Sequence, residues 1–219
     1  QLIKKYQFVK NKVIVIYEGV DPKIKRVNQK FTQKTLDHYK INSPYILYVG
    51  SLYPHKNIPA LLKAIKILSD KSYPINLVII SARNVFQERV KKQIKKLGIK
   101  NKVKILNFLT DKELAAFYQK ATAFVFPSLM EGFGLPGLEA MQCGCPVLAA
   151  NSSCLPEIYG QAALYFDPQK PEKIAKMVLE VPNSFSIRQN LINKGYERVK
   201  LFSWEKNVSE TLRVYRKII

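Results

Sequence analysis

Short apolar runs alternate along the chain with segments in which apolar residues recur at helical spacing. The runs are YILYVG (45–50), INLVII (75–80), VKILNF (103–108), AFVFP (123–127) and PVLAAN (146–151). Continuous apolar runs of this length are typical of parallel strands that are buried on both faces. The regular alternation predicts βαβ units, and therefore an α/β fold with a Rossmann-like, doubly wound parallel sheet and flanking helices.

Local signals mark where the helices begin and end. Between the first two strands, one stripe of a helix is formed by Ile58, Leu61, Leu62, Ile65 and Leu68. Thr110 followed by Glu113 predicts a capping box at a helix start, and Gly144 is placed to end a later helix. After Pro171 the pattern is helical to the end of the chain, with SWEKNVSETLRVYRKI (203–218) as the last helix.

The first part of the chain does not fit this alternation. The segment KVIVIYEGVD (12–21) predicts a strand that ends in a turn, and a lysine-rich segment follows it up to Pro44. The sequence opens on Gln1 rather than on methionine. We therefore expect residues 1–43 to be the remnant of a preceding N-terminal domain with a connector. Residues 44–219 are expected to form the Rossmann-like domain.

Composition is that of a globular protein, with 47% apolar and 24% charged residues, but the charge balance is strongly basic. Thirty-six Lys and Arg against sixteen Asp and Glu leave a net charge of +20. This balance favours anionic partners such as phosphates, nucleic acid or acidic lipid. A lysine-rich coding bias would produce the same count, so the net charge alone does not choose among them.

The basic residues are densest in RVKKQIKKLGIKNKVK (89–104), which holds eight basic residues and no acidic one. One side of a predicted helix carries Lys91, Lys92, Lys95 and Lys96, opposite Val90, Ile94 and Leu97. This side is either a solvated outer face or a patch that contacts an anionic membrane surface electrostatically. No apolar run approaches the roughly 20 residues of a membrane span, and no signal peptide opens the chain.

The three cysteines, Cys143, Cys145 and Cys154, show no metal-ligand spacing with His38 or His55. Small buried thiols in a reducing cytosol are the simplest interpretation. We therefore expect no metal at these positions.

The loop GSLYPHKN (50–57) follows the first predicted strand, and ligands of parallel α/β sheets bind beyond the carboxyl ends of the strands. Gly50 permits a tight turn, and His55 and Lys56 precede a helix that Asn57 or Ile58 opens. A cation beside a helix N-terminus is a setting for phosphate. The alternative is a solvated surface lysine.

The loop EGFGLPGLE (131–139) follows the fourth predicted strand. Pro136 suits the first turn of a helix, so we expect Glu139 in that first turn and Glu131 in the loop before it. Gly132 and Gly134 allow backbone N–H groups to turn towards a ligand, which predicts an anion-binding nest at the positive end of a helix.

The two carboxylates at the ends of this loop need a different role, because a phosphate site disfavours nearby negative charge. Each is suited to accept hydrogen bonds from hydroxyl groups. A phosphate in the middle and hydroxyls at both ends describe a nucleoside diphosphate sugar. The alternative is that Glu131 is solvated and that Glu139 interacts with the helix dipole. In the loop NFLTD (107–111), Phe108 and Leu109 could form one wall of a base pocket or belong to the core.

The segments YILYVGSLYPHKN (45–57) and FVFPSLMEGFGLPGLEAMQCGCPVLAANSSCLPEIYGQAALYFDP (124–168) resemble the C-terminal, donor-binding half of retaining GT-B glycosyltransferases of the GT4 family. Glu131 and Glu139 match the E-x7-E motif of that family. The similarity runs from about residue 13 to residue 218, and the combination of motifs is highly specific.

The resemblance implies that Glu139 holds the ribose hydroxyls, that Glu131 contacts the transferred sugar as the catalytic residue, and that Lys56 binds the diphosphate. The family commonly places a second cation directly after the loop glycine, where this chain has Ser51, so we expect His55 or Arg83 to compensate. It also usually has glycine at the position of Asn107. The expected donor-binding residues are Gly50, Ser51, His55, Lys56, Phe108, Leu109, Glu131, Gly132, Phe133, Gly134, Leu135 and Glu139.

The resemblance further implies transfer of a sugar from a GDP- or UDP-sugar to a glycan or a lipid-linked acceptor, without a metal or other cofactor. An N-terminal Rossmann-like domain would bind the acceptor, so the chain alone is expected to bind donor without transferring it. The expected location is cytoplasmic, with peripheral contact at the inner face of the membrane. Two alternatives remain: a GT-B sugar-nucleotide epimerase, and a basic module that binds nucleotides or nucleic acid. No stacking-aromatic or recognition-helix pattern supports nucleic-acid binding, and EGFGLPGLE would have no role in it.

Overall fold

A computed structural model describes residues 5–7, 12–83 and 85–217 of the chain. Its internal contacts divide it into two compact units. Residues 21–201 form the larger unit, and the described parts of residues 1–20 and 202–219 form the smaller one. The sheet and every candidate site residue lie in the larger unit.

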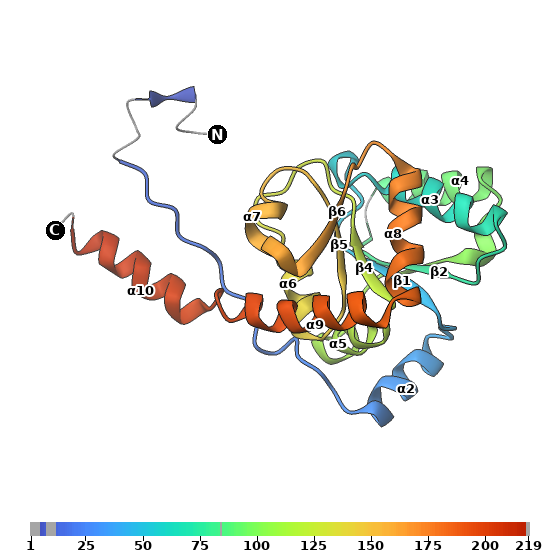
Figure 1. The fold of residues 1–219 in the computed structure, drawn as a ribbon, viewed down its shortest axis with the longest axis horizontal. Helices are drawn as coiled ribbons and strands as arrows, with labels where there is room; N and C mark the ends of the chain where they lie inside the picture. The colour runs from blue at the N-terminus through green and yellow to red at the C-terminus, as the bar shows by residue number, and fades with distance from the viewer. Residues whose placement is uncertain (1–4, 8–11, 84, 218–219) are drawn as a thin grey trace. The chain divides into compact units, whose positions relative to one another are not determined.

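The larger unit is built around one six-stranded sheet in the order β3-β2-β1-β4-β5-β6, with all neighbouring strands parallel (Figure 1). The strands are β1 (Tyr45–Val49), β2 (Asn76–Ile80), β3 (Val103–Leu106), β4 (Ala123–Phe126), β5 (Val147–Ala150) and β6 (Ala163–Phe166). The five predicted strands and the doubly wound parallel sheet are confirmed. β6 is not predicted by the sequence pattern, because four residues with two half-buried members carry a weak signal.

Helices cover both faces of the sheet (Figure 1). One layer holds α3 (Ile58–Asp70), α4 (Phe86–Lys96) and α8 (Pro171–Asn183), and the other holds α2 (Gln29–His38), α5 (Asp111–Lys120), α6 (Leu135–Gln142) and α9 (Phe185–Val199). The short helix α7 (Leu155–Tyr159) and the 3-10 turns η2 (Pro54–Lys56), η3 (Lys100–Lys102) and η4 (Gly160–Ala162) lie in the connections. The strand order reverses between β1 and β4, and the loops that carry the site follow these two strands.

The core follows the predicted pattern. The apolar stripe of α3 is buried against the sheet, since none of its five predicted residues is more than 2% exposed. Each such side chain stabilises the fold by about 1.5–3 kcal/mol relative to an exposed one. The capping box at Thr110 and Glu113 is present at the start of α5, and Gly144 has the positive φ (73°) expected after α6.

The smaller unit differs from the prediction for residues 12–21. No strand forms among the described residues of this segment, and Ile14 and Val15 are 56% and 67% exposed. A strand needs a neighbouring strand to pair its backbone groups, whereas this segment joins the end of the chain through Val20 N–H, which donates to the Phe202 carbonyl (3.2 Å). The predicted last helix is confirmed as α10 (Trp204–Tyr215), with Ser203 as its N-cap.

Residues 21–43 belong by their contacts to the unit that holds the sheet. The side-chain amide of Gln142, at the end of α6, donates to the carbonyls of Asp21 (2.9 Å) and Ile24 (2.6 Å). The assignment of residues 1–43 to a preceding domain and connector stays a prediction, and part of that segment (1–4 and 8–11) lies outside the described residues.

Among the helices of the described residues, none combines the length and the apolar character that crossing a membrane requires.

Candidate functional site

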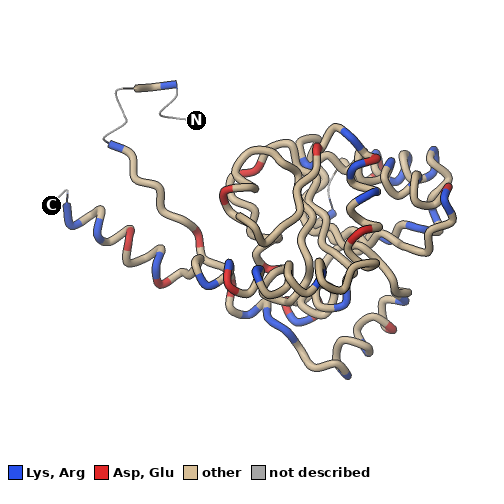
Figure 2. Tube along the Cα trace, viewed as in Figure 1, with Lys and Arg blue, Asp and Glu red and all other residues tan. Residues whose placement is uncertain are grey.

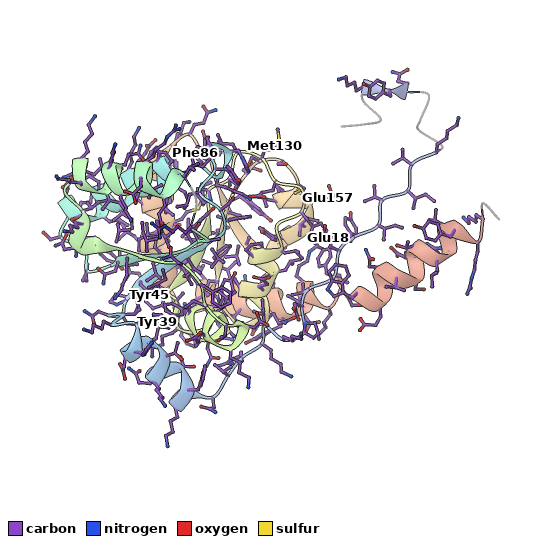
Figure 3. All side chains as sticks on the ribbon, turned by 180° about the vertical axis from the view of Figure 1, so that it is seen from behind. Glu18, Tyr39, Tyr45, Phe86, Met130 and Glu157 are labelled. Carbon is purple, nitrogen blue, oxygen red and sulfur yellow. The ribbon has the colours of Figure 1, made fainter. Side chains whose placement is uncertain are left out.

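The loops that follow β1 and β4 lie side by side at the carboxyl end of the sheet, on either side of the point where the strand order reverses. Figure 3 shows Phe86 and Met130, which follow β2 and β4, at one end of the sheet, and Tyr39 and Tyr45 at the opposite end. Open parallel sheets bind ligands at the carboxyl end of this switch point. The two loops with the strongest sequence signals therefore occupy the expected place.

The two loops are joined by an ion pair. The Lys56 Nζ donates to both Glu131 carboxylate oxygens, at 2.7 and 2.8 Å, and the two side chains are only 16% and 9% exposed. Beside the pair, the Leu129 N–H donates to the His55 carbonyl (2.8 Å). The ring of Phe126 lies 5.6 Å from the Lys56 Nζ. These contacts exclude the alternatives in which Lys56 or Glu131 is merely a solvated side chain.

The glycine-rich loop ends where α6 begins. Gly134 is the N-cap of α6 with a φ of 106°, and a Cβ there would lie 2.5 Å from the Tyr159 hydroxyl oxygen. That hydroxyl donates to the Gly134 carbonyl (2.7 Å). Only glycine fits this close approach in a left-handed conformation. No side chain caps the start of α6, which lies at the positive end of the helix dipole. Within this first turn Pro136 has no N–H, and the Gly137 N–H donates to the Gly134 carbonyl (3.1 Å).

One detail of the predicted helix is wrong. α6 begins at Leu135 with Pro136 in its first turn, as predicted, but Glu139 lies in the second turn and not in the first. The reason is that Gly134, rather than a residue closer to Glu139, terminates the loop. The alternative role of Glu139 as a partner of the helix N-terminus is weakened, because dipole effects are confined to the first turn.

The loop after β5 contacts the backbone of the glycine-rich loop through Ser153 and Cys154. The Ser153 hydroxyl donates to the Glu131 carbonyl (2.9 Å) and accepts from the Glu131 N–H (3.2 Å). The Cys154 thiol lies within hydrogen-bonding distance of the carbonyls of Glu131 (3.3 Å) and Phe133 (3.4 Å). The sequence pattern does not reveal these roles, because Ser153 and Cys154 lie more than twenty positions from the residues they contact.

Glu139 is held by a buried tyrosine. The Tyr118 hydroxyl, on α5, donates to the Glu139 carboxylate at 3.0 Å, and Tyr118 is fully buried. Burial raises the pKa of Glu139, the Tyr118 hydrogen bond opposes this, and the negative charges of Asp21 and Asp111 raise the pKa further. Tyr118 resembles an ordinary core residue of α5 in the sequence, so its contact depends on the tertiary structure.

We expect Glu139→Gln to increase thermal stability at neutral pH. Because the pKa of Glu139 is higher in the folded protein than its ordinary value of 4.5, ionisation of Glu139 opposes folding. This cost sets in as the pH rises above the ordinary value and is complete once the pH exceeds the folded-state pKa. Below pH 4.5 the Glu139 carboxyl is mostly uncharged in both the folded and the unfolded protein, so the stability gained by the Glu139→Gln change should disappear. Melting temperatures of both proteins at about pH 4 and at neutral pH measure this; the same offset at both pH values would contradict it.

The residues of the loop NFLTD (107–111), after β3, make other contacts. Phe108 is 84% exposed, and Asn107 accepts a hydrogen bond from the buried side chain of Gln87 (2.8 Å). At the first loop, the Ser51 carbonyl accepts from the Tyr48 hydroxyl (2.6 Å). The base-pocket role of Phe108 and Leu109 stays a prediction, as does compensation by His55 or Arg83.

The thiols of Cys143 and Cys145 are buried, and burial raises the pKa of each to about 12. The part of the chain that the structure describes contains no group of three or more His, Cys, Asp or Glu side chains suited to a metal ion. The absence of a metal requirement remains a prediction.

Residues 32–198 match the family model described as Glycosyl transferases group 1. The O-antigen chain mannosyltransferase B of Escherichia coli is 35% identical over 173 residues, which are 78% of this chain and 45% of that protein. The chain thus spans about half the length of the curated relatives it matches.

Solved structures share the fold. A glycosyltransferase from Rickettsia africae superposes with a TM-score of 0.89 at 20% identity, covering 99% of this chain and 60% of that one. Anabaena HepE, crystallised in complex with UDP and glucose, gives a TM-score of 0.77 at 21% identity, covering 94% of this chain and 56% of that one. The family model covers most of the chain and its two signature loops, so this chain belongs to the group 1 glycosyltransferases.

Proposed function

We propose that this chain is the donor-binding part of a retaining glycosyltransferase and that it binds a nucleoside diphosphate sugar. The observation that carries the proposal is the part-buried Lys56–Glu131 pair in the loops that lead to η2 and to the N-terminus of α6, which no side chain caps. Relatives named as mannosyltransferases and the HepE complex with UDP and glucose support a GDP- or UDP-sugar as the donor. Neither the epimerase nor the nucleic-acid-binding alternative gains support from these relatives.

Each residue of the site has a separate role in this proposal. Lys56 and the positive N-terminal end of α6 bind the diphosphate, because a cation and a helix N-terminus both stabilise negative charge. Glu139, held by Tyr118, accepts hydrogen bonds from the two ribose hydroxyls. Glu131 contacts the transferred sugar. As the sugar leaves, Lys56 and the helix dipole stabilise the charge that develops on the diphosphate without a metal ion.

Calorimetric titration with UDP, GDP and their 2′,3′-dideoxy analogues tests the proposal. The wild type should bind one of the two diphosphates and prefer the ribose form, and chelator should leave this binding unchanged. Glu139→Gln should weaken the ribose form about tenfold or more, because two hydrogen bonds to a charged acceptor become neutral. Equal affinity for ribose and dideoxyribose nucleotides would contradict the assignment of Glu139, and loss of binding in chelator would contradict the metal-free site.

The proposal includes a second domain that binds a glycan or lipid-linked acceptor. The match covers 45% and 51% of the length of two relatives that are named as mannosyltransferases. In the smaller unit, Trp204, Val208 and Leu212 follow one another along one side of α10, and each is more than 40% exposed. Apolar side chains in such a row are suited to contact with another protein surface. We therefore propose that the 219-residue chain binds the donor without transferring sugar.

We also propose that the exposed side of α4 contacts an anionic cytoplasmic membrane surface. Lysine positions follow one another along this helix (Figure 2), and Lys91, Lys92, Lys95 and Lys96 are all exposed. Of the predicted apolar side, Val90 and Ile94 are buried and Leu97, which follows the helix, is half-buried, so α4 offers charge rather than an apolar face. Lys91 is paired with Glu88 at 2.8 Å, which reduces its contribution.

Co-sedimentation with neutral and with acidic vesicles measures this contact. Each lysine near an anionic surface contributes about 1 kcal/mol at physiological salt, so binding should be confined to acidic vesicles and should fall steeply as salt rises. Changing the four lysines of α4 to Gln should remove most of it. A matched control changes four exposed lysines on other helices (Lys34, Lys112, Lys120 and Lys173) to Gln. An equal loss in both variants would indicate a response to net charge alone.

A further inference from the structure

Asn57 follows Lys56 directly and makes contacts that the roles described so far do not include. Its side-chain amide donates to two backbone carbonyls, that of Pro127 after β4 (3.1 Å) and that of Pro168 after β6 (2.8 Å). These partners lie 70 and 111 positions away in the sequence. One half-buried side chain therefore ties the loop after β1 to two other loops at the carboxyl end of the sheet.

The backbone of Asn57 is held in a conformation that makes these contacts possible. Its φ of 56° and ψ of 36° are left-handed, a region that non-glycine residues seldom adopt and in which asparagine is enriched. This turn separates η2, which carries Lys56, from α3. Its side chain makes no helix-capping hydrogen bond, so both donors of the amide are directed to the other loops.

Three consecutive residues of this loop thus bind the segment after β4. The His55 carbonyl accepts from the Leu129 N–H, the Lys56 ammonium pairs with Glu131, and the Asn57 amide donates to the Pro127 carbonyl. Along the loop after β1 the two hydrogen bonds flank Lys56, and they join this loop to Pro127 and Leu129, just before Glu131. A long, four-carbon lysine side chain has many conformers in the absence of such a frame, and ordering it costs conformational entropy.

We propose that Asn57 is a positioning residue of the donor site, whose amide fixes the loop that carries Lys56 against the ends of β4 and β6 and so sets where Lys56 meets its partners. In the protein without nucleotide, the proposal states only that Asn57 positions the Lys56–Glu131 pair. The part that concerns binding rests on the proposed function, because it assigns Lys56 to the diphosphate.

Asn57→Gly is the informative change, since glycine adopts the left-handed conformation freely and loses only the amide. Ser72→Gly is the matched control: Ser72 also has a φ of 56° and is exposed in the turn after α3. Asn57→Asp keeps the size of the side chain but directs carboxylate oxygens, in place of N–H donors, at two carbonyls. Asn57→Asp should therefore lower thermal stability and diphosphate affinity more than Asn57→Gly does.

The first experiment uses no ligand. The loss of thermal stability caused by Lys56→Met is measured in the wild type and in the Asn57→Gly and Ser72→Gly backgrounds. If Asn57 positions the ion pair, the loss should shrink to about half in the Asn57→Gly background and stay unchanged with Ser72→Gly, because contacting groups are energetically coupled. An undiminished loss in the Asn57→Gly background would overturn the proposal, whether or not the protein binds nucleotide.

The second experiment titrates the bare diphosphate, UDP or GDP. Asn57→Gly should weaken binding about five- to tenfold in the wild type, and less than twofold in the Lys56→Met/Glu131→Gln background, in which Lys56 is no longer available to be positioned. Equal weakening in both backgrounds would overturn the proposal and leave the donor site standing. If the wild type binds neither diphosphate while the ligand-free coupling is present, the proposed function fails and the positioning of the ion pair by Asn57 stands.

Discussion

Replacing Lys56 with Met is expected to lower the free energy of unfolding by about 3 kcal/mol, because the Glu131 carboxylate is then left buried without its partner. Adding Glu131→Gln should restore most of this stability, since the double variant has no unpaired charge at the site. Chemical denaturation of the three proteins measures the effect. Lys63→Met, on the exposed side of α3, is the control for loss of a lysine and should change stability little.

The same variants separate stability from binding. Lys56→Met should weaken the nucleoside diphosphate by roughly 1.5–3 kcal/mol, or about 10- to 150-fold, because a charge-assisted contact is lost. The Lys56→Met/Glu131→Gln double variant should regain stability but not affinity. If affinity returned together with stability, Lys56 would be a structural residue and the assignment to the diphosphate would be wrong.

Glu131→Gln is expected to change the preference between the donor and its product. In the ligand-free protein Glu131 neutralises Lys56, so a bare diphosphate must share Lys56 with a carboxylate that also repels it. Removing that charge should tighten binding of the bare diphosphate about three- to tenfold, equivalent to about 1 kcal/mol. A sugar-bearing donor gains less, because it loses its contact with the carboxylate.

The measurement is the ratio of the two dissociation constants, for the diphosphate and for the corresponding diphosphate sugar, in wild type and variant. Glu172→Gln removes the same charge from an exposed position on α8 and serves as the control. Weaker binding of the bare diphosphate by Glu131→Gln would show that the ion pair prepares Lys56 for the ligand instead of competing with it.

The sequence predicts the site loops well because their signals are local. Gly134 and Pro136 determine where the backbone turns and where α6 begins, and both effects act within a few residues. The one local error is the placement of Glu139 in the first turn of α6. It arises because the helix begins at Leu135, early enough to put Glu139 in the second turn. The left-handed N-cap at Gly134 is stabilised partly by Tyr159, a contact that no local pattern contains.

The predicted strand at residues 12–21 failed for the opposite reason. The apolar residues of this segment have strand propensity, but a strand forms only when neighbouring backbone supplies its hydrogen bonds. β6 shows the converse, because its short and half-buried pattern becomes a strand through pairing of all four residues with β5. Pairing partners, and not the apolar pattern alone, determined which segments became strands.

The sequence by itself determined the parallel α/β sheet and the positions of the two loops, and it singled out Lys56, Glu131 and Glu139 as the charged candidates for the site. These follow from hydrophobic periodicity and from glycine and proline positions, which act over one or two turns of chain. Only the tertiary structure decided that Lys56 pairs with Glu131, that Tyr118 holds Glu139 and that Asn57 joins three loops. Each of these contacts joins positions at least 21 residues apart, and the strand order, which brings the carboxyl ends of β1, β4 and β6 to one edge, creates them.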